Sequence, residues 1–433
     1  MKVVMVGAGY VGLVSGACFS EFGADVTCVD LVESRIAALR AGKMPIYEPG
    51  LEQLVERNVN AGRLHFSTSL ADEVPAADVV FIAVGTPTRR GDGHADLTYV
   101  YAAAKDIAKY LDGYTVVVNK STVPVGTAAQ VARILGEENP AADFSVASNP
   151  EFLREGAAIG DFMRPDRVVL GVADERAETL LRALYRPINL IEAPILVTNW
   201  ESAELTKYAA NAFLATKISF INEIANLCEA VGADVHDVAK GMGLDGRIGR
   251  KFVHPGPGYG GSCFPKDTLA MIRIAQEHEV PSRIVESVVE VNAAQKARMV
   301  RKIRAALGDL SGKKIAILGL TFKPGTDDMR DAPSLSMIPA LLDKGATIVA
   351  HDPQGMNEAR EHLPASTGYV DNIWDAIEGA DAVVLLTEWN EYRNLDLLKV
   401  KKLMRGNAFL DFRNVYERKN MENMGFEYSA VGR

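Results

Sequence analysis

The chain has few cysteines, no long apolar run and no excess of basic residues. Its four cysteines lack the paired short spacings of a disulfide framework or a zinc site, so we expect no metal ion and a reducing, cytoplasmic compartment. No stretch reaches the roughly 18 consecutive apolar residues of a membrane-spanning helix, which predicts no membrane association. The net charge of −9 argues against a nucleic-acid partner, and any anionic ligand must be bound by local basic groups and backbone donors.

The length and the hydrophobic pattern predict several domains. A chain of 433 residues exceeds one ordinary hydrophobic core, and 48% hydrophobic with 24% charged residues is typical of globular proteins. In the first part of the chain, short buried strand patterns alternate with helical patterns, which predicts a parallel sheet covered by helices. The predicted strands cover residues 2–6, 25–29, 77–84, 114–119 and 145–147.

Similar signals return near the C-terminus. Three segments repeat the N-terminal pattern in the same order: 313–319 after 2–6, 345–352 after 23–30, and 380–386 after 77–83. Residues 200–307 instead have helical spacing, interrupted by a glycine-rich loop at 256–261. The sequence therefore predicts an α/β fold with two Rossmann-like, doubly wound parallel-sheet domains joined by a central helical domain.

The same pattern predicts domain boundaries and an assembly. We expect an N-terminal domain at residues 1–198, a central helical domain at 199–307 and a C-terminal domain at 308–433. A long helix with an apolar face between two domains often makes a subunit contact. This pattern favours an oligomer formed through the central helices.

A glycine motif follows the first predicted strand. Gly7, Gly9 and Gly12 have the G-x-G-x-x-G spacing, open a predicted helix, and precede Asp30 at the end of the second strand. Glycines at these positions allow the tight turn, the close approach of a pyrophosphate and helix–strand packing. Asp30 can accept hydrogen bonds from both ribose hydroxyls and repels a 2′-phosphate. The motif predicts NAD rather than NADP, with a glycine turn that binds no ligand as the alternative.

The corresponding turn of the C-terminal domain breaks this motif. It reads Gly319-Leu320-Thr321-Phe322-Lys323. Phe322 would obstruct a closely bound pyrophosphate, whereas Lys323 provides a cation at the same point of the fold. We therefore expect this domain to bind a different phosphorylated ligand, such as a nucleotide diphosphate.

The glycine-rich loop leads to a cysteine. Residues 258–267 read GYGGSCFPKD, and Pro265 suits the first position of a helix. Cys263 would then precede a helix N-terminus with Lys266 nearby, and both features favour a thiolate. The other three cysteines lie in apolar patterns typical of core residues. This arrangement predicts that Cys263 is a nucleophile, with an inert loop cysteine as the alternative.

Two pairs of polar residues have i, i+4 spacing. Lys207 and Asn211 share one face of a predicted helix among apolar neighbours. Glu151 and Glu155 follow a strand end, at the edge where ligands bind in such sheets. A hydride acceptor beside a reactive thiol suggests two oxidations, because an aldehyde has a second hydride to give only after a nucleophile adds to it. Water would then cleave the resulting thioester.

Seven segments together resemble the UDP-glucose 6-dehydrogenase family, within the wider UDP-glucose/GDP-mannose dehydrogenase superfamily. They are GAGYVG at 7–12, VGTP at 84–87, STVPVGT at 121–127, NPEFLREG at 149–156, KYAANAFLA at 207–215, RIGRKFVHPGPGYGGSCFPKD at 247–267 and GLTFKPGTDDMRDAPS at 319–334. The likeness covers nearly the whole chain. It implies oxidation of UDP-glucose to UDP-glucuronate with two NAD and one water, by a dimer joined through its central helices.

The resemblance also implies residue roles. The residues with implied catalytic roles are Cys263 as nucleophile, Asp267 and Thr122 for the proton or an ordered water in the first oxidation, Lys207 and Asn211 for the thiohemiacetal oxyanion, Glu151 for thioester hydrolysis, and Glu155 beside both ligands. Implied cofactor contacts are Gly7, Gly9, Tyr10, Val11, Gly12, Asp30, Arg35, Thr86, Thr122, Glu155, Lys266 and Arg330. Implied contacts to the nucleotide sugar are Glu151, Phe152, Leu153, Arg154, Glu155, Lys207, Asn211, Phe252, Val253, His254, Pro255, Gly256, Gly260, Lys323 and Arg413, with Arg247 reaching the sugar site of the partner subunit.

Three other functions stay open. One is the same four-electron chemistry on GDP-mannose or an N-acetylated UDP-sugar, although residues 246–249 and 251–256 look most like the UDP-glucose branch. Another is a two-electron dehydrogenase of the 6-phosphogluconate type, which would need no cysteine. The third is a non-enzymatic sensor that binds NAD and a nucleotide. The number of NADH formed per sugar separates the first two, and any turnover excludes the third.

Overall fold

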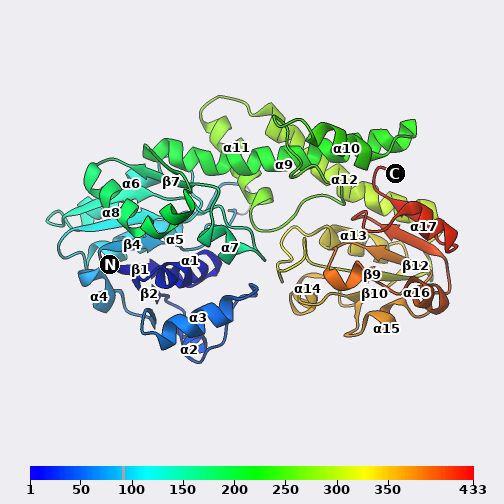
Figure 1. Cartoon of the computed structure of the whole chain (residues 1–433), viewed down its shortest axis with the longest axis horizontal. Helices are drawn as coiled ribbons and strands as arrows, with labels where there is room; N and C mark the ends of the chain where they lie inside the picture. The colour runs from blue at the N-terminus through cyan, green and yellow to red at the C-terminus, as the bar shows by residue number, and fades with distance from the viewer. Residues whose placement is uncertain (90–92) are drawn as a thin grey trace. The chain divides into compact units, whose positions relative to one another are not determined.

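The computed structural model describes residues 1–89 and 93–433 (Figure 1). The described chain forms two compact units, Met1–Ala210 and Asn211–Arg433. Among the helices of the described residues, none is long and apolar enough to cross a membrane.

The first unit is built on one large sheet. Its strands are β1 (Lys2–Val6), β2 (Asp25–Val29), β3 (Leu64–Ser67), β4 (Val79–Ile82), β5 (Thr115–Asn119), β6 (Phe144–Ser148), β7 (Val168–Val172) and β8 (Ile195–Thr198). In space their order is β3-β2-β1-β4-β5-β6-β7-β8. Neighbouring strands are parallel except β6 and β7, which are antiparallel. The carboxyl ends of β1 to β6 therefore meet at one edge, where ligands bind in such sheets.

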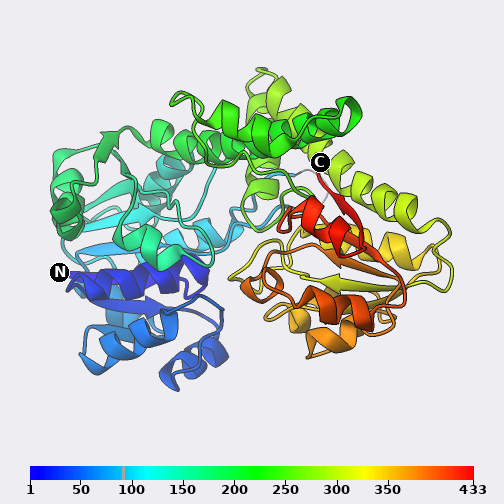
Figure 2. The same ribbon diagram turned by 45° about the vertical axis from the view of Figure 1, so that its right-hand side comes forward.

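Helices cover both faces of this sheet (Figure 2). Side chains of β1 alternate between the two faces, because Val3 and Met5 belong to one buried cluster and Val4 and Val6 to the other. The helices are α1 (Tyr10–Glu21), α2 (Glu33–Arg40), α3 (Leu51–Asn60), α4 (Leu70–Glu73), α5 (Thr98–Ala108), α6 (Thr127–Glu138), α7 (Ala158–Met163) and α8 (Glu175–Leu184), with 3₁₀ turns at Val74–Ala76 and Arg186–Ile191.

The second unit repeats this topology. Its strands are β9 (Lys314–Leu318), β10 (Thr347–His351), β11 (Gly368–Tyr369), β12 (Ala382–Leu385), β13 (Ala408–Asp411) and β14 (Glu427–Ala430). They are all parallel, in the order β11-β10-β9-β12-β13-β14. This order matches that of the first six strands in the other sheet. The predicted pair of doubly wound sheets is confirmed.

The predicted central helical region is also confirmed. Residues 200–307, which the structure describes throughout, form α9 (Trp200–Val231), α10 (Val235–Gly243), α11 (Phe264–Glu277) and α12 (Arg283–Leu307). Helix α9 begins in the first unit and continues into the second. The remaining helices are α13 (Pro333–Leu342), α14 (Met356–His362), α15 (Ile373–Ile377), α16 (Leu397–Leu403) and α17 (Arg418–Asn423), with a 3₁₀ turn at Asn390–Tyr392.

Some strands differ from those that the sequence predicts. The strand predicted at 77–84 is shorter, at Val79–Ile82, because the chain leaves the sheet before Gly85. The predictions missed β3, β7 and β8 of the first sheet and β11, β13 and β14 of the second. β3 and β8 are short edge strands, and β8 is mostly half-exposed, so neither has the long apolar run of a central strand.

Candidate active site

The turn between β1 and α1 has three glycines in different surroundings. Gly7 has φ +104°, and a Cβ atom there would lie 2.6 Å from the carbonyl oxygen of Ala83. A Cβ atom on Gly12 would overlap the carbonyl of Gly7, whereas one on Gly9 would meet open space. No side chain caps the N-terminus of α1, so its first N–H groups face that space. The turn therefore has room and donors for a pyrophosphate.

Asp30 lies at the end of β2 beside this turn. Its carboxylate accepts hydrogen bonds from the N–H groups of Ala8 (2.8 Å) and Val32 (2.9 Å) and forms an ion pair with Arg35 (2.8 Å). Burial alone would raise the pKa of Asp30, but these three donors outweigh burial and lower it. Asp30 is therefore an ionised acceptor at the place that the sequence predicts for a ribose contact.

Tyr10 and Val11 are the first two residues of α1, and Tyr10 bonds to a distant carboxylate. The Tyr10 hydroxyl donates to Glu48 Oε2 at 2.5 Å. Buried Glu48 also accepts from the N–H groups of Gly156 (2.6 Å) and Ala158 (2.8 Å). Glu48 thus ties the end of the segment 149–156 to the glycine turn.

Thr86 and Thr122 lie in the loops that follow β4 and β5. The Thr86 hydroxyl donates to the carbonyl of Thr122 at 2.9 Å, which joins the two loops. Farther along the second loop, the buried carboxylate of Glu204 accepts from the N–H groups of Gly126 (2.7 Å) and Ala128 (2.8 Å). Glu204 therefore caps α6 from α9, although the two are far apart in sequence.

Glu151 forms a buried ion pair with Lys207. Glu151 Oε1 lies 3.1 Å from Lys207 Nζ, and the Glu151 carboxylate accepts from the N–H of Leu153 at 2.5 Å. The ring centroid of Phe152, the residue after Glu151, lies 5.3 Å from Lys207 Nζ and 3.5 Å from the guanidinium carbon of Arg167. The first unit thus joins two predicted catalytic residues, Glu151 and Lys207.

Two arginines among the predicted substrate contacts form ion pairs with nearby carboxylates in this structure. Arg154 forms a two-pronged ion pair with Asp161 in its own segment, which also contains half-buried Glu155. Exposed Arg247 forms a similar pair with Asp245.

Cys263 is the residue immediately before α11. The helix begins at Phe264 and Pro265 is its second residue, so the predicted helix start is wrong by one position, and Cys263 is the N-cap. The Cys263 thiol is half-buried, with Sγ 3.4 Å from the hydroxyl oxygen of Ser262. By contrast, Cys18, Cys28 and Cys228 are buried, as expected for core residues, and burial raises the pKa of the Cys18 and Cys28 thiols to about 12.

Asp267, one turn into α11, connects two other predicted residues. Its carboxylate accepts from Asn211 Nδ2 at 2.6 Å and lies 2.5 Å from Lys266 Nζ. The loop before Cys263 packs against the segment that contains Arg330, whose carbonyl accepts from the N–H of Gly261 at 2.7 Å. A Cβ atom on Gly260 would overlap the carbonyl of Asp331, so this packing requires glycine.

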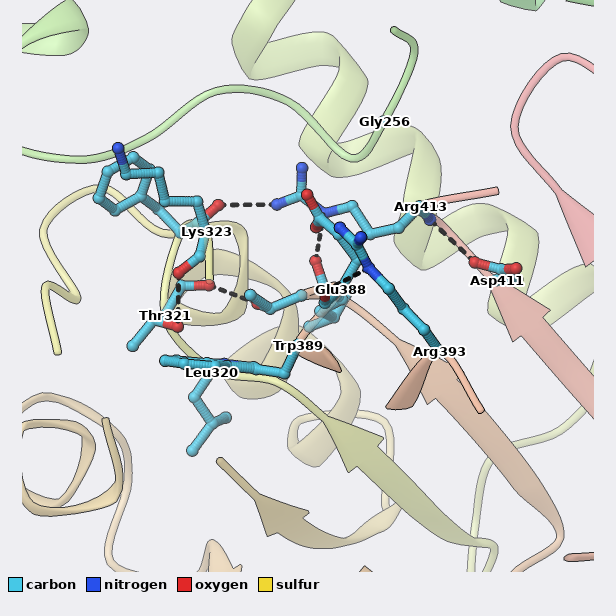
Figure 3. Close-up of polar contacts among 12 residues, drawn as sticks. Gly256, Leu320, Thr321, Lys323, Glu388, Trp389, Arg393, Asp411 and Arg413 are labelled. Carbon is cyan, nitrogen blue, oxygen red and sulfur yellow. Dashed lines mark hydrogen bonds and ion pairs between the residues drawn. The ribbon is translucent and has the colours of Figure 1, made fainter. Parts of the chain in front are cut away.

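A further group of predicted residues lies near the carboxyl edge of the second sheet (Figure 3). The Arg413 guanidinium donates to the carbonyls of Leu386 (2.6 Å) and Phe322 (2.7 Å) and lies 3.1 Å from Glu388. It thereby joins the loop after β12 to the turn that carries Lys323.

The segment 252–256 approaches Arg413. A Cβ atom on Gly256 would lie 3.5 Å from an Arg413 nitrogen, and Asn222 and Gln295 anchor the backbone of Gly256. In this segment Val253 and Pro255 are buried, His254 is exposed, and Phe252 has φ +64° with its ring 6.2 Å from that of Phe264. Gly256, Lys323 and Arg413 therefore gather at one place in the second unit.

Asp352 occupies in the second sheet the position that Asp30 has in the first, but it is fully buried. A carboxylate offers about four lone-pair positions. Asp352 accepts from the backbone N–H groups of Leu320, Thr321, Gln354 and Gly355 and from the side chains of Thr321 and Trp389. It has no capacity left for ribose hydroxyls, which agrees with the prediction that this domain binds a different ligand.

Sequence reasoning missed three buried ionisable residues around these loops, Glu48, Lys120 and Glu204. Glu204 gave a weak signal, because it precedes Lys207 by three residues and so shares its face of α9. Glu48 gave none, since two of its partners, Gly156 and Ala158, lie more than a hundred residues along the chain and Tyr10 lies 38 residues before it. Lys120 follows the apolar strand β5 directly, where a lysine is usually exposed.

Comparisons with known proteins agree over the whole chain. Three models of the UDP-glucose/GDP-mannose dehydrogenase family match: the NAD binding domain at residues 1–189, the central domain at 201–294 and the UDP binding domain at 316–418. The chain is 58% identical to a UDP-glucose 6-dehydrogenase of Rhizobium meliloti (strain 1021), covering 100% of both. It is also similar to the structure of a UDP-glucose dehydrogenase from Pyrobaculum islandicum (TM-score 0.92, 42% identity, covering 100% and 97%). A UDP-D-ManNAc dehydrogenase from Pyrococcus horikoshii is less similar in sequence (TM-score 0.87, 26% identity, covering 100% and 99%).

Proposed function

The chain belongs to the UDP-glucose/GDP-mannose dehydrogenase family, and from this we propose that it oxidises UDP-glucose to UDP-glucuronate with two NAD and one water. It is an NAD-dependent nucleotide-sugar dehydrogenase. The observation that carries the choice of UDP-glucose is the 58% full-length identity to a UDP-glucose 6-dehydrogenase, against 26% for the enzyme that acts on an N-acetylated sugar.

The β1–α1 turn is the proposed NAD site. The space beside Gly9, the uncapped N-terminus of α1 and ionised Asp30 fit a pyrophosphate and a ribose diol. The other proposed cofactor contacts in the same unit lie on α1, on α2 and in loops; they are Tyr10, Val11, Arg35, Thr86, Thr122 and Glu155. Lys266 and Arg330 are proposed to complete the contacts. Bound NAD accepts one hydride in each of the two oxidations.

The proposed reaction passes through a covalent bond to Cys263. The first oxidation removes a hydride from C6 and a proton from its hydroxyl, which leaves an aldehyde. The Cys263 thiolate adds to this carbonyl carbon, and protonation of the oxygen gives a thiohemiacetal. Loss of a second hydride and a proton leaves a thioester. Water then adds, the C–S bond breaks, and the products are a carboxylate and the restored thiol.

Two ion-paired groups support the roles of the other residues. Asp267, held by Asn211 and Lys266 in the first turn of α11, is proposed to take the proton of the first oxidation, with Thr122 holding an ordered water. Lys207 and Asn211 are proposed to stabilise the oxyanion, and Glu151 to activate the hydrolytic water.

The second sheet is the proposed site of the nucleotide. Lys323 and Arg413 supply positive charge there in a chain with net charge −9, and Gly256 leaves room beside Arg413. The remaining proposed substrate contacts belong to two segments. The adjoining loop contains Phe252, Val253, His254, Pro255 and Gly260, and the segment that carries Glu151 contains Phe152, Leu153 and Arg154. The UDP binding domain model matches residues 316–418, which include most of this sheet.

We also propose a homodimer through α9 and α12. Phe213, Phe220 and Leu227 recur every seven residues on α9 and are 65%, 47% and 56% exposed. A hollow of about 300 Å³ lies beside them, lined by residues of α9 and α12 that include Phe220, Ile284 and Val291. An exposed apolar stripe of this kind marks an interaction surface. A dimer there would let Arg247, which is exposed in one subunit, reach the partner.

The proposed domain division and compartment follow from the same scheme. We propose domains at residues 1–198, 199–307 and 308–433, with α9 to α12 as the central one. A catalytic Cys263 must stay a thiol, which favours the reducing cytoplasm.

A panel of nucleotide sugars with NAD and NADP tests the substrate and cofactor. We expect two NADH per UDP-glucose, and one NADH per sugar would contradict the covalent route.

Cys263→Ser should stop turnover and leave the sugar attached at residue 263 as an ester, because an ester is cleaved far more slowly than a thioester. The attached sugar is measured as added mass of the intact chain. Ser262→Ala is the control and should still form two NADH.

A further inference from the structure

Lys120 is a buried amine at the carboxyl end of β5. Its side chain is 3% exposed, and Nζ donates to Asn149 Oδ1 (2.9 Å) and to the Tyr185 hydroxyl (3.1 Å). The amine also lies 5.7 Å from the ring centroid of Phe162 and 5.8 Å from that of Tyr185. Both hydrogen-bond partners are neutral, so the charge of a protonated Lys120 is not balanced by direct contact with a carboxylate through these bonds.

An amine in this place is costly for folding. Burial lowers the pKa of Lys120 to about 7, the negative charge of Glu151 partly restores it, and the positive charge of Lys207 lowers it further. A methionine of similar length would fill the same space without burying a polar group. The amine therefore gives the fold no obvious advantage over an apolar side chain, and its contacts indicate a different role.

Those contacts converge on Asn149. Its Oδ1 accepts from Lys120 and from the Tyr185 hydroxyl (2.6 Å), and its Nδ2 donates to the carbonyl of Val169 (2.9 Å). Its backbone N–H donates to the carbonyl of Asn119 (2.9 Å). The side chain of Asn149 is thus held from β5, from β7 and from the end of α8. Glu151, two residues later, pairs with Lys207 at 3.1 Å.

We propose that Lys120 is a positioning residue for thioester hydrolysis: by holding Asn149, it fixes the turn at residues 149–151 from which Glu151 reaches Lys207. The inference rests on the proposed function, in which Glu151 activates the hydrolytic water. Without the amine, Asn149 Oδ1 keeps only the Tyr185 hydroxyl, and the turn gains freedom. A misplaced base lowers the rate of one step without changing how the ligands bind.

A double-mutant cycle tests whether Lys120 acts through Glu151. Lys120→Met, Glu151→Gln and the double variant are compared for the rate at which the thioester at Cys263 is cleaved, followed by the mass of the intact chain. We expect Lys120→Met to slow cleavage about tenfold in the wild-type background and less than about twofold in the Glu151→Gln background. The effects should not add, because Lys120 is proposed to act on cleavage through the position of Glu151. The Kd values for NAD and UDP-glucose should stay unchanged, since only the cleavage step is slowed. Lys105→Met, on the exposed side of α5, is the control and should have no effect.

The pH profile gives a second reading. The charges of Glu151 and Lys207 act on the Lys120 amine, which also donates a hydrogen bond to the Tyr185 hydroxyl. Because its pKa is lowered to about 7, the amine becomes protonated as the pH falls through this value. The wild-type cleavage rate should therefore have an inflection near pH 7 that Lys120→Met lacks.

The outcomes separate the two levels of inference. If Glu151→Gln leaves cleavage at the wild-type rate, the proposed role of Glu151 is wrong, and the role of Lys120 falls with it. If Glu151→Gln slows cleavage but Lys120→Met has the same effect in both backgrounds, only the Lys120 inference is overturned. Should Lys120→Met not fold, Tyr185→Phe removes just the hydroxyl that shares Asn149, and the same cycle applies. An additive result for that variant would also refute the inference.

Discussion

Replacing Glu204 with glutamine should change how stability depends on pH. Burial raises the pKa of Glu204 from 4.5 to about 7, although the N–H groups of Ala128, Gly126 and Thr127 oppose the rise. A carboxyl group with a raised pKa in the folded state contributes stability that is complete below its unfolded pKa and is lost as pH rises through the folded pKa. The free energy of unfolding should therefore fall between pH 4.5 and 7 on account of this group.

The size of the effect follows from the two pKa values. Each pKa unit corresponds to about 1.4 kcal/mol, so titration of Glu204 lowers the free energy of unfolding by about 2.5 kcal/mol between pH 5 and pH 8. Glutamine is neutral throughout and does not contribute this loss. For a unit of this size, one kcal/mol corresponds to about 2–4 °C, so the unfolding midpoint of Glu204→Gln should gain about 5–10 °C relative to wild type across that range.

Circular dichroism melts at pH 5, 6, 7 and 8 measure this difference. Glu201→Gln is the matched control, because Glu201 is exposed on the same turn of α9, and its difference from wild type should be nearly constant with pH. A constant difference for Glu204→Gln would refute the reasoning, since it would mean that Glu204 is already ionised at pH 5.

Three further predictions concern the ligands and the assembly. Asp30→Ala should weaken NAD binding by about tenfold or more and reduce the preference for NAD over NADP, because charged hydrogen bonds are worth about 1.5–3 kcal/mol and Arg35 loses its ion pair. Steady-state kinetics with both cofactors measure this preference. A wild-type enzyme that uses NAD and NADP equally would contradict the role of Asp30. Lys323→Ala should raise the KM for UDP-glucose or lower turnover while the Kd of NAD stays constant; an equal loss of NAD affinity would assign Lys323 to the other site. Phe220→Glu should give monomers in light scattering, whereas Leu398→Glu, equally apolar and exposed on α16, should not; a Phe220→Glu dimer would exclude this face.

Local patterns predicted much of the fold and part of the site. The glycine spacing at residues 7–12, with Asp30 beyond it, predicts a strand, a turn and a helix, and Gly7 and Gly12 lie where a Cβ atom would clash with backbone. Cys263 could be placed before a helix because Pro265 suits the first turn of a helix. These features depend on residues close in sequence.

Other features depend on residues far apart in sequence and could not be predicted. The antiparallel direction of β7 follows from the path of the chain between residues 149 and 167 and leaves no periodic signal. Glu204 caps a helix that begins more than seventy residues earlier, and the buried amine of Lys120 lies near the rings of Tyr185 and Phe162, more than forty residues away in sequence. A single buried charge has no sequence pattern that distinguishes it from an exposed one.

The saturated carboxylate of Asp352 has a consequence for the order of ligand exchange. On the proposed route, NADH must leave and a fresh NAD must enter while the sugar is still attached to Cys263. A second sheet with the same strand order could trap the incoming dinucleotide if its acid were available. Because Asp352 already accepts from donors of its own turn and from Trp389, it does not offer the ribose contact that Asp30 is proposed to make, and on the proposed route NAD is exchanged at the first sheet. One nucleotide can then be exchanged while the other is retained.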